Sequence, residues 1–417
     1  MGMVEEEVVI VGAGIAGLAT AIALKRVGVR ALVLEKSDGL RTTGAALGLF
    51  PNAWLALDAL GVSHKLTSIY APTQKGCITN VGSGTVQEVS IGANSDSGNG
   101  FRCVHRRALL EALAEELPKD AIRFFSKLSS IETQAQEGSS VAIIRLEDGA
   151  IIKAKVLIGC DGVHSVVARW LGLSKLVDSG RWAVRGLAMF PQGHGLKQEA
   201  QQFVDTGKRA GLIPLTDKEV YWFFVGKSTI KGEDMTSDPE LIQREVLENF
   251  ANDFPPSYKD IVRHSDLASL SWAPLMFRYP WDVIFGKVSK GNITVAGDAM
   301  HPMTPDLGQG GCAALEDAVV LGRHIGESFI QNKGLKPAEV ARAINGYVKA
   351  RRWRTAMLIT GSFLSGWVQQ GGSTWMKSFR DLIFYGLLFR RLFTIHYDCG
   401  KLPSVSSGKL EGQSKID

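Results

Sequence analysis

Residues that could carry chemistry are concentrated in the stretch GDAMHPMTPDLGQGG, residues 297–311. It contains the carboxylate of Asp298, the imidazole of His301 and the rigid prolines Pro302 and Pro305. Carboxylate and imidazole groups transfer protons, and the glycines that follow leave backbone N–H groups open to a ligand. The stretch therefore predicts a ligand site. Taken alone, it is interpreted equally well as a loop that ends in a helix N-cap.

A second motif, GAGIAG, begins at residue 12, and its glycines are Gly12, Gly14 and Gly17. We predict a strand over residues 7–11 before it, a helix over 15–27 after it, and a strand over 31–35 that ends in Glu35. This order is the dinucleotide-binding fingerprint: the glycines allow a tight turn, close approach of a pyrophosphate and close helix packing. Glu35 would accept hydrogen bonds from ribose hydroxyls and repel a 2′-phosphate.

The third motif is GCDGVHSVVARWLG, residues 159–172, where an apolar strand ends at Asp161 and Gly162. A helix is predicted over 164–172. The alternative is purely structural, because Asp161 could make the turn while His164 or Ser165 caps the helix.

Together the three motifs resemble those of the group A flavoprotein monooxygenases, the p-hydroxybenzoate hydroxylase-like family. The resemblance covers roughly residues 7–325 and includes VHRRALLEAL, residues 104–113. Within the family, the order and sequences of the motifs most resemble those of the plant salicylate hydroxylase-like and zeaxanthin epoxidase-like enzymes. It implies bound FAD and transient use of NAD(P)H. It also implies a flavin C4a-hydroperoxide that transfers oxygen to a substrate.

The resemblance also assigns residues. Asp298 would hold the ribityl or phosphate arm of FAD, and the glycines near the start of the following helix would lie beside the flavin pyrimidine edge. The cofactor-binding candidates are Gly12, Gly14, Ala16, Gly17, Glu35, Lys36, Arg106, Asp161, Gly162, Gly297, Asp298, Pro305, Gly308, Gly310 and Gly311. The catalytic candidates are His301, Pro302 and Arg185. For His301, packing or hydrogen bonding is the alternative to a role as general base.

The expected fold class is α/β (α+β overall). We expect a discontinuous Rossmann-like FAD-binding domain, an inserted β-sheet substrate domain and C-terminal helices. The FAD-binding domain would comprise residues 1–75, 101–180 and 281–335, and the substrate domain residues 76–100 and 181–280. Helices would fill 336–400, and 401–417 would form a disordered tail.

The aromatic strands predicted between residues 181 and 280 would form the wall over the flavin. The pocket candidates are Phe203, Leu212, Pro214, Trp222, Phe224 and Met276. Aromatic residues in strands are also typical of a core. Arg185 lies in an apolar strand, so it would bind a carboxylate or phenolate, or else point outward as a surface charge.

Composition narrows the class of protein further. A net charge of +5 spread over 417 residues disfavours a nucleic-acid partner. Five cysteines without paired or metal-type spacing indicate free thiols in the cytoplasm or another reducing compartment, with no metal site. Acidic residues 5–7 precede the apolar start, which disfavours a signal or transit peptide.

The segment SFRDLIFYGLLFRRLF, residues 378–393, combines an apolar face with Arg380, Arg390 and Arg391. It could make weak contact with a membrane surface, or pack as a helix on the FAD-binding domain.

The leading hypothesis is hydroxylation of a small aromatic or heteroaromatic substrate with O2. An epoxidase or hydroxylase of a terpenoid or other lipophilic substrate is the enzymatic alternative. A non-catalytic FAD-binding ligand sensor is the alternative of another class.

Overall fold

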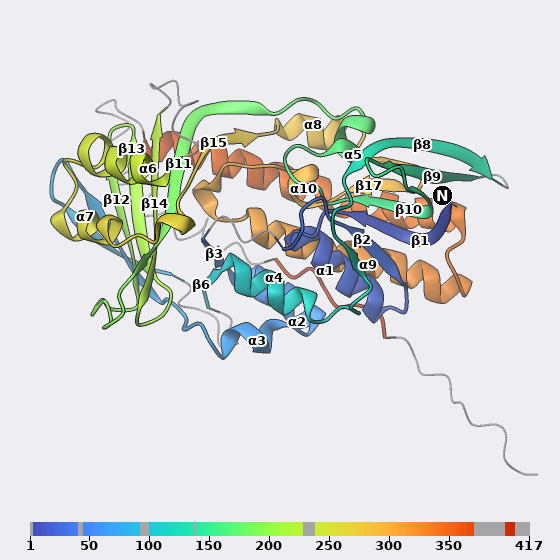
Figure 1. The fold of residues 1–417 in the computed structure, drawn as a ribbon, viewed down its shortest axis with the longest axis horizontal. Coiled ribbons are helices and arrows are strands. Elements are labelled where there is room, and N and C mark those ends of the chain that lie inside the picture. The colour runs from blue at the N-terminus through green and yellow to red at the C-terminus, as the bar shows by residue number, and fades with distance from the viewer. Residues whose placement is uncertain are drawn as a thin grey trace, which may run out of the picture.

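The computed structural model describes residues 3–40, 45–91, 100–136, 139–227, 238–370 and 397–404. Two large sheets lie at opposite ends of the molecule, and a two-stranded sheet lies between them (Figure 1). The expected α/β class with two sheet-based parts is confirmed.

The larger sheet has the strand order β16-β17-β10-β1-β2-β7, and β9 and β8 extend it from β10. Its strands are β1 (Val4–Val11), β2 (Ala31–Leu34), β7 (Ile122–Arg123), β8 (Leu128–Gln136), β9 (Ser139–Leu146), β10 (Ile151–Gly159), β16 (Ser289–Lys290) and β17 (Ile293–Val295). The central strand β1 pairs in parallel with β2 and β10, and β10 pairs in parallel with β17. The three sequence motifs therefore follow strands of one parallel sheet, and their loops meet at its carboxyl edge.

The second sheet has the order β15-β11-β14-β13-β12-β4-β5. Its strands are β4 (Lys75–Asn80), β5 (Val86–Ser90), β11 (Val177–Met189), β12 (Glu199–Asp205), β13 (Lys208–Pro214), β14 (Glu219–Lys227) and β15 (Ser271–Phe277). The sequence segments 76–100 and 181–280 thus both supply strands to this sheet. The domain boundaries drawn through them remain a proposal. Strands β3 (Ala46–Leu49) and β6 (Arg102–His105) form the small sheet.

The helices cover both sheets (Figure 1). They are α1 (Ile15–Arg26), α2 (Pro51–Leu60), α3 (Ser63–Thr67), α4 (Arg106–Ala114), α5 (Val166–Trp170), α6 (Pro239–Glu245), α7 (Pro256–Arg263), α8 (Pro280–Phe285), α9 (Gly310–Asn332) and α10 (Pro337–Gln369). A π-helix, Val246–Phe250, continues α6, and three 3-10 turns span Leu267–Ser269, Gly297–Ala299 and Pro305–Leu307. Helices α6 and α7 cover the outer face of the second sheet.

Most expected elements are confirmed with small shifts at their ends. Helix α5 begins at Val166 rather than at residue 164, because Ser165 is its N-cap. The segment 378–393, for which the sequence leaves a packed helix or a membrane-surface contact open, lies outside the described residues, as does the tail beyond residue 404. All five cysteines are free thiols, as expected.

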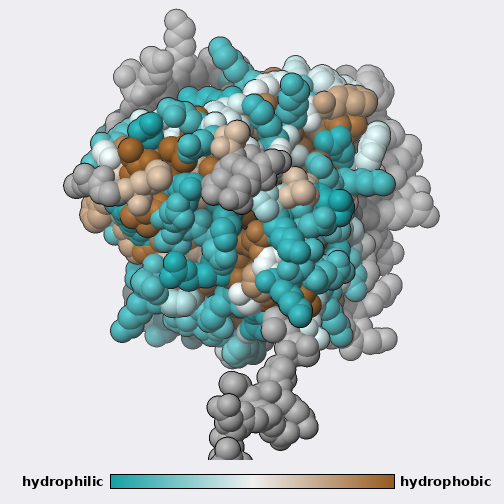
Figure 2. Space-filling view, turned by 90° about the vertical axis from the view of Figure 1, so that its right-hand side faces the viewer, coloured by the Kyte–Doolittle hydropathy of each residue, from teal (hydrophilic) through white to brown (hydrophobic). Residues whose placement is uncertain are grey.

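Within the described part of the chain, no helix has the length and apolar character needed to cross a membrane. Figure 2 shows the end of the molecule remote from the second sheet, which is mainly hydrophilic with small separate hydrophobic areas. No group of three metal-ligating side chains occurs among the described residues.

Candidate active site

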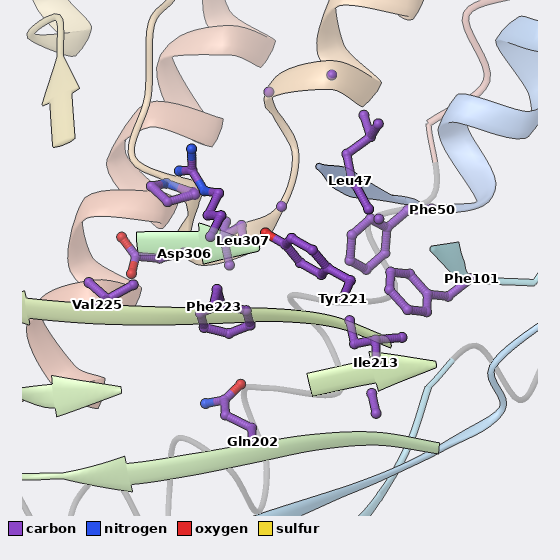
Figure 3. A pocket seen from close by; sticks show the side chains of 18 of the residues that line it. Leu47, Phe50, Phe101, Gln202, Ile213, Tyr221, Phe223, Val225, Asp306 and Leu307 are labelled. Carbon is purple, nitrogen blue, oxygen red and sulfur yellow. The ribbon is translucent and has the colours of Figure 1, made fainter. Parts of the chain in front are cut away.

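A cavity of about 350 Å³ lies between the second sheet and the loops at the carboxyl edge of the larger sheet (Figure 3). One side consists of Ile15 at the start of α1, residues 46–48 of β3, and the segment 303–311 that contains the start of α9. The facing side consists of β4, β5 and strands β11 to β14. The cavity thus joins the GAGIAG motif and the stretch 297–311 to the sheet that the sequence assigned to the substrate.

The GAGIAG motif makes a tight turn between β1 and α1. Gly12 has a φ of +103°, and a β-carbon there would lie 2.5 Å from the carbonyl oxygen of Cys160. A β-carbon on Gly17 would collide with the carbonyl oxygen of Gly12, so α1 packs directly on the turn. A β-carbon on Gly14 would meet nothing within 4 Å. The first and last glycines therefore close the turn, whereas Gly14 faces open space in which a phosphate could approach the backbone.

The start of α1 is suited to an anion. Gly14 is its N-cap without a side-chain hydrogen bond, and the first turn contains no acidic residue. The first-turn N–H groups of a helix have no acceptor within the helix, and the helix dipole is positive there. Nearby, Glu35 accepts hydrogen bonds from the backbone N–H groups of Ala13 at 2.8 Å and Ser37 at 2.9 Å. These bonds fix its carboxylate beside the glycine turn, while Lys36 is exposed.

The start of α9 presents a second free helix N-terminus, and this one borders the cavity. Gly308 has a φ of +65° and turns the chain so that α9 begins at Gly310. Its N-cap, Gln309, makes no capping bond to the helix, and the first turn has no acidic residue. Gly310 and Gly311 line the cavity. Their backbone N–H groups can therefore stabilise negative charge on a group bound there.

The side chains of Asp298 and Arg106 also line the cavity. Asp298 is exposed. Its Oδ1 lies 4.0 Å from the position that a β-carbon would take on Gly310. The stretch 297–311 thus brings together Asp298, Pro305 and the glycines at positions 308, 310 and 311, as the sequence predicted, and the junction of β6 and α4 adds Arg106.

Alternation along β14 sends Tyr221, Phe223 and Val225 into the cavity. The strand register places Arg185 of β11 and Gly211 of β13 beside Phe223. A β-carbon on Gly211 would lie 2.6 Å from the Phe223 ring, so this glycine lets the ring lie close to the sheet. Figure 3 shows Tyr221 and Phe223 on the same side of the cavity, with Leu307 and the Phe50–Phe101 pair across from them. The Phe50 and Phe101 rings are 4.9 Å apart.

None of the six predicted pocket residues lines this cavity. They are Phe203, Leu212, Pro214, Trp222, Phe224 and Met276. Phe203, Leu212, Trp222 and Phe224 belong to the apolar cluster under α6 and α7, on the other face of the sheet. The alternative interpretation of these aromatic strands as core is confirmed for that face.

Arg185 lines the cavity as the sequence hypothesis proposed, and no ion pair or hydrogen bond of its side chain is found among the described residues. It lies near Tyr221, whose side chain also faces the cavity. Burial raises the pKa of Tyr221 to about 12, so its hydroxyl remains protonated at neutral pH and can donate a hydrogen bond. Arg185 and Tyr221 therefore form one polar region of the cavity lining.

A buried ion cluster that the sequence did not reveal forms one wall. Arg181 donates two hydrogen bonds to Asp306, at 2.9 and 2.8 Å, and Arg209 donates to the same carboxylate at 3.3 Å. Arg209 also donates to Gln369 of α10 at 3.0 Å. The cluster joins the second sheet to the segment before α9 and to α10. The residues lie far apart in the chain, so spacing alone could not reveal it.

His301 is fully buried and does not line the cavity, which contradicts its prediction as a catalytic base. Its Nε2 lies 2.5 Å from Oδ2 of Asp317, which also accepts a hydrogen bond from the backbone N–H of Gly297 at 2.8 Å. The hydrogen-bonding alternative is therefore the one that the geometry supports. Pro302 is likewise buried away from the cavity, and its carbonyl accepts from the backbone N–H of Arg278.

Asp161 has the structural role that the sequence left open. Its carboxylate accepts from the hydroxyl of Ser165 at 2.5 Å and from the backbone N–H of Val166 at 2.7 Å, at the start of α5. Burial raises its pKa. Gly162 has a φ of +76°, which allows the turn before this cap. A role of either residue towards FAD or NAD(P)H remains a prediction.

Comparisons with known proteins identify the family. The family described as FAD binding domain matches residues 5–334. This chain belongs to the group A flavoprotein monooxygenases. Monooxygenase 2 of Arabidopsis thaliana is 41% identical over 407 residues, covering 95% of this chain and 98% of that protein. Monooxygenase 1 of the same plant is 38% identical over 412 residues, covering 96% and 100%.

The solved structure of Klebsiella pneumoniae HpxO, complexed with FAD and uric acid, has the same fold. Its TM-score is 0.77 at 24% sequence identity, covering 93% of this chain and 92% of that chain. Because the FAD binding domain family matches residues 5–334, FAD is the cofactor of the present monooxygenase, an oxidoreductase of the hydroxylase type.

The residues present fit FAD. The open side of Gly14 and the uncapped start of α1 suit the pyrophosphate, and the carboxylate of Glu35 suits the ribose hydroxyls. The uncapped start of α9 suits the pyrimidine edge of the ring.

Replacing Asp298 with alanine should weaken FAD binding by roughly tenfold, because a carboxylate that accepts a hydrogen bond from the cofactor would be lost. The unfolding midpoint of the apoprotein should not change, since the side chain is exposed. FAD titration would measure the dissociation constant. Asp120→Ala, on the exposed turn after α4, is the control. Unchanged FAD affinity in Asp298→Ala would remove this role.

The buried ion network of His301, Asp317, Arg351 and Glu316 should make the thermal stability of the protein depend on pH. Burial would raise the pKa of Asp317, but His301 and Arg351 lower it to about 2 from an ordinary 3.8. The pKa of Glu316 is lowered as well. A lowered folded-state pKa stabilises the protein above the unfolded-state pKa, and this stability is lost as pH falls through the folded value. We expect the thermal unfolding midpoint to fall progressively between about pH 4.5 and pH 2. Asp317→Asn should reduce this dependence, and an identical profile would contradict the assignment.

Proposed function

We propose that this monooxygenase uses NAD(P)H and O2 to hydroxylate a small aromatic or heteroaromatic substrate that carries an anionic oxygen. The observation that carries the proposal is the polar region of Arg185 and Tyr221, within a cavity bordered by the N-terminus of α9. Bound FAD supplies the activation of O2 for this reaction. The protein supplies the shape, the charge and the exclusion of water.

The cavity divides into two functional surfaces. The glycine segment before and within the start of α9 would hold the flavin edge. The facing side of the second sheet would hold the substrate. The rings of Phe223, Tyr221 and Phe101 offer apolar contact to a planar molecule. Arg185 would bind its carboxylate or phenolate, and this contact would fix which carbon faces the flavin.

The apolar lining also excludes bulk water, which preserves reactive oxygen for transfer to the substrate. This lining includes Ile78, Val89, Ile91 and Phe101. Because these side chains have no polar groups, a terpenoid or other lipophilic substrate is the second candidate. The charged Arg185 favours the first.

The test uses the purified holoprotein with NADH and with NADPH in separate assays. Oxidation of each reductant and release of peroxide would be followed with phenolic acids, purines and terpenoids. We expect an anionic aromatic compound to stimulate oxidation with little peroxide and to yield a hydroxylated product. Stimulation by terpenoids alone would favour the second candidate. Oxidation that yields only peroxide with every compound would contradict both.

Replacing Arg185 with methionine should raise KM for an anionic substrate by roughly ten- to a hundredfold, since a charge-assisted hydrogen bond would be lost. A neutral analogue should be affected much less. Steady-state kinetics with an acid and its methyl ester would measure the difference. Arg263→Met, which is exposed on α7 beyond the opposite face of the sheet, is the matched control. An equal effect on the acid and the ester would contradict the role of Arg185.

A further inference from the structure

Helices α8 and α10 expose an unusual set of large apolar side chains. On α10, Trp353, Met357, Leu364 and Trp367 recur at intervals of three, four or seven residues, which places them along one stripe of the helix. Trp353 is 60% exposed and Met357 64%. On α8, Trp281 and Phe285 are 53% and 80% exposed. Single exposed apolar residues need no explanation, but a group on neighbouring elements indicates an interaction surface.

Ring contacts make the surface continuous between the two helices. Phe277 lies 5.1 Å from Phe363 of α10 and 5.5 Å from Tyr279. Tyr279 in turn stacks on Trp281 of α8 at 4.4 Å. We call the exposed members of this group the aromatic face. They are Tyr279, Trp281, Phe285, Trp353, Met357, Phe363, Leu364 and Trp367.

The charge around the aromatic face is positive. Residues 340–370 contain five basic residues and no acidic residue. Arg351 and Arg354 are paired with Glu316 or Asp317 of α9, but Lys349 is exposed one helical turn before Trp353. Lys287 is exposed just after α8. The chain beyond α10 continues with four basic residues and one acidic residue between positions 371 and 396.

Another face of α10 packs behind residues that line the cavity. A β-carbon on Gly361 would lie 3.1 Å from Leu307, and one on Gly366 would lie 2.5 Å from the carboxylate of Asp306. Gln369 accepts a hydrogen bond from Arg209. A single helix therefore carries the aromatic face and also supports the cavity lining from behind.

We propose that the aromatic face binds the surface of an anionic lipid membrane. Tryptophan and tyrosine rings are suited to the boundary between headgroups and acyl chains, and Lys349 and Lys287 would contact the negative headgroups. The helices would lie on the membrane rather than span it. This contact would hold the cavity next to a lipid phase from which an apolar compound could partition.

The test is flotation of the full-length holoprotein with vesicles. Phosphatidylcholine vesicles would be compared with vesicles of phosphatidylcholine and phosphatidylserine, at low and high salt. We expect flotation with the anionic vesicles, weaker flotation at high salt, and quenching of tryptophan fluorescence by brominated lipid. No flotation with either vesicle would overturn the proposal.

The double variant Trp353→Gln/Leu364→Gln removes two members of the face. It should lower the partition coefficient by about tenfold or more, since two large apolar side chains no longer enter the lipid. Phe125→Gln is the matched control, because Phe125 is 73% exposed on a different part of the protein. An equal loss in both variants would contradict the assignment. The flavin absorbance per protein confirms that each variant is folded.

A second copy of the chain is the competing occupant of this face. Light scattering at low and high protein concentration would detect it. A dimer that the double variant converts to a monomer, without vesicle binding by either protein, would overturn the membrane assignment. An unchanged mass for both proteins together with flotation of only the parent protein would support it.

Discussion

Replacing Gly14 with alanine is expected to leave the fold intact and to weaken FAD binding by about tenfold or more. The backbone of Gly14 is extended, with φ −83° and ψ −173°, so alanine is allowed there. Its β-carbon would meet no protein atom within 4 Å. It would instead occupy the space at the start of α1 in which the pyrophosphate approaches the backbone. Fold and cofactor binding can therefore be separated at this position.

Two measurements distinguish these effects. The thermal midpoint of the apoprotein should match that of the parent protein, whereas the FAD dissociation constant should rise. Gly39→Ala is the matched control, since a β-carbon there also meets nothing within 4 Å. Gly17→Ala provides the opposite case, because its β-carbon collides with the turn and should destabilise the apoprotein as well. Unchanged FAD affinity in Gly14→Ala would mean that the pyrophosphate lies elsewhere.

Replacing Arg351 with methionine should lower the free energy of unfolding by about 3 to 5 kcal/mol, the loss typical of breaking a buried ion pair. The Arg351 side chain is fully buried between two carboxylates of α9. Its Nε lies 2.6 Å from Asp317, and its Nη1 lies 2.7 Å from Glu316. Without Arg351, the negative charges of these buried carboxylates would be balanced only in part, by contacts with His301, Arg354 and Asn52.

Chemical unfolding of the apoprotein would measure this loss. Arg352→Met is the control at the next position, where the side chain is only partly buried. It should change stability by no more than about 0.5 kcal/mol. In the double variant Arg351→Met/Asp317→Asn, the loss should be smaller than the sum of the single losses, because fewer buried charges remain unpaired. Additive losses would contradict a direct interaction between these residues.

The motif loops could be predicted because their chemistry is local. A tight turn, a free helix start and an acid at the end of the next strand follow from consecutive residues, as with Gly12 and Glu35. The parallel order of β2, β1 and β10 then brings the loops to one edge without further information.

The substrate side could not be predicted in the same way. Alternation along β14 separates Tyr221 and Phe223 from Trp222 and Phe224, but it does not say which face meets the cavity. The register of β11 with β14 puts Arg185 opposite Phe223, and this pairing depends on strands far apart in the chain. The aromatic residues chosen from the sequence therefore belong to the other face.

His301 illustrates the same limit for a single side chain. Its position in a glycine-rich loop is compatible with a general base as well as with a buried hydrogen-bonding or packing role. The partner that decides between them is Asp317, which lies within α9, 16 residues after His301. Asp317 also accepts a hydrogen bond from Arg351 of α10. Because these residues lie far apart in the chain, the sequence alone did not predict the buried network.

The most direct test of the central claim is the fate of O2 in the holoprotein. The compound that most stimulates NAD(P)H oxidation would be incubated with isotopically labelled O2, and its product would be analysed by mass spectrometry. The proposed function predicts one labelled oxygen atom per product molecule, and weaker coupling in Arg185→Met. Unlabelled substrate recovered intact, with one peroxide formed for each NAD(P)H oxidised, would contradict it.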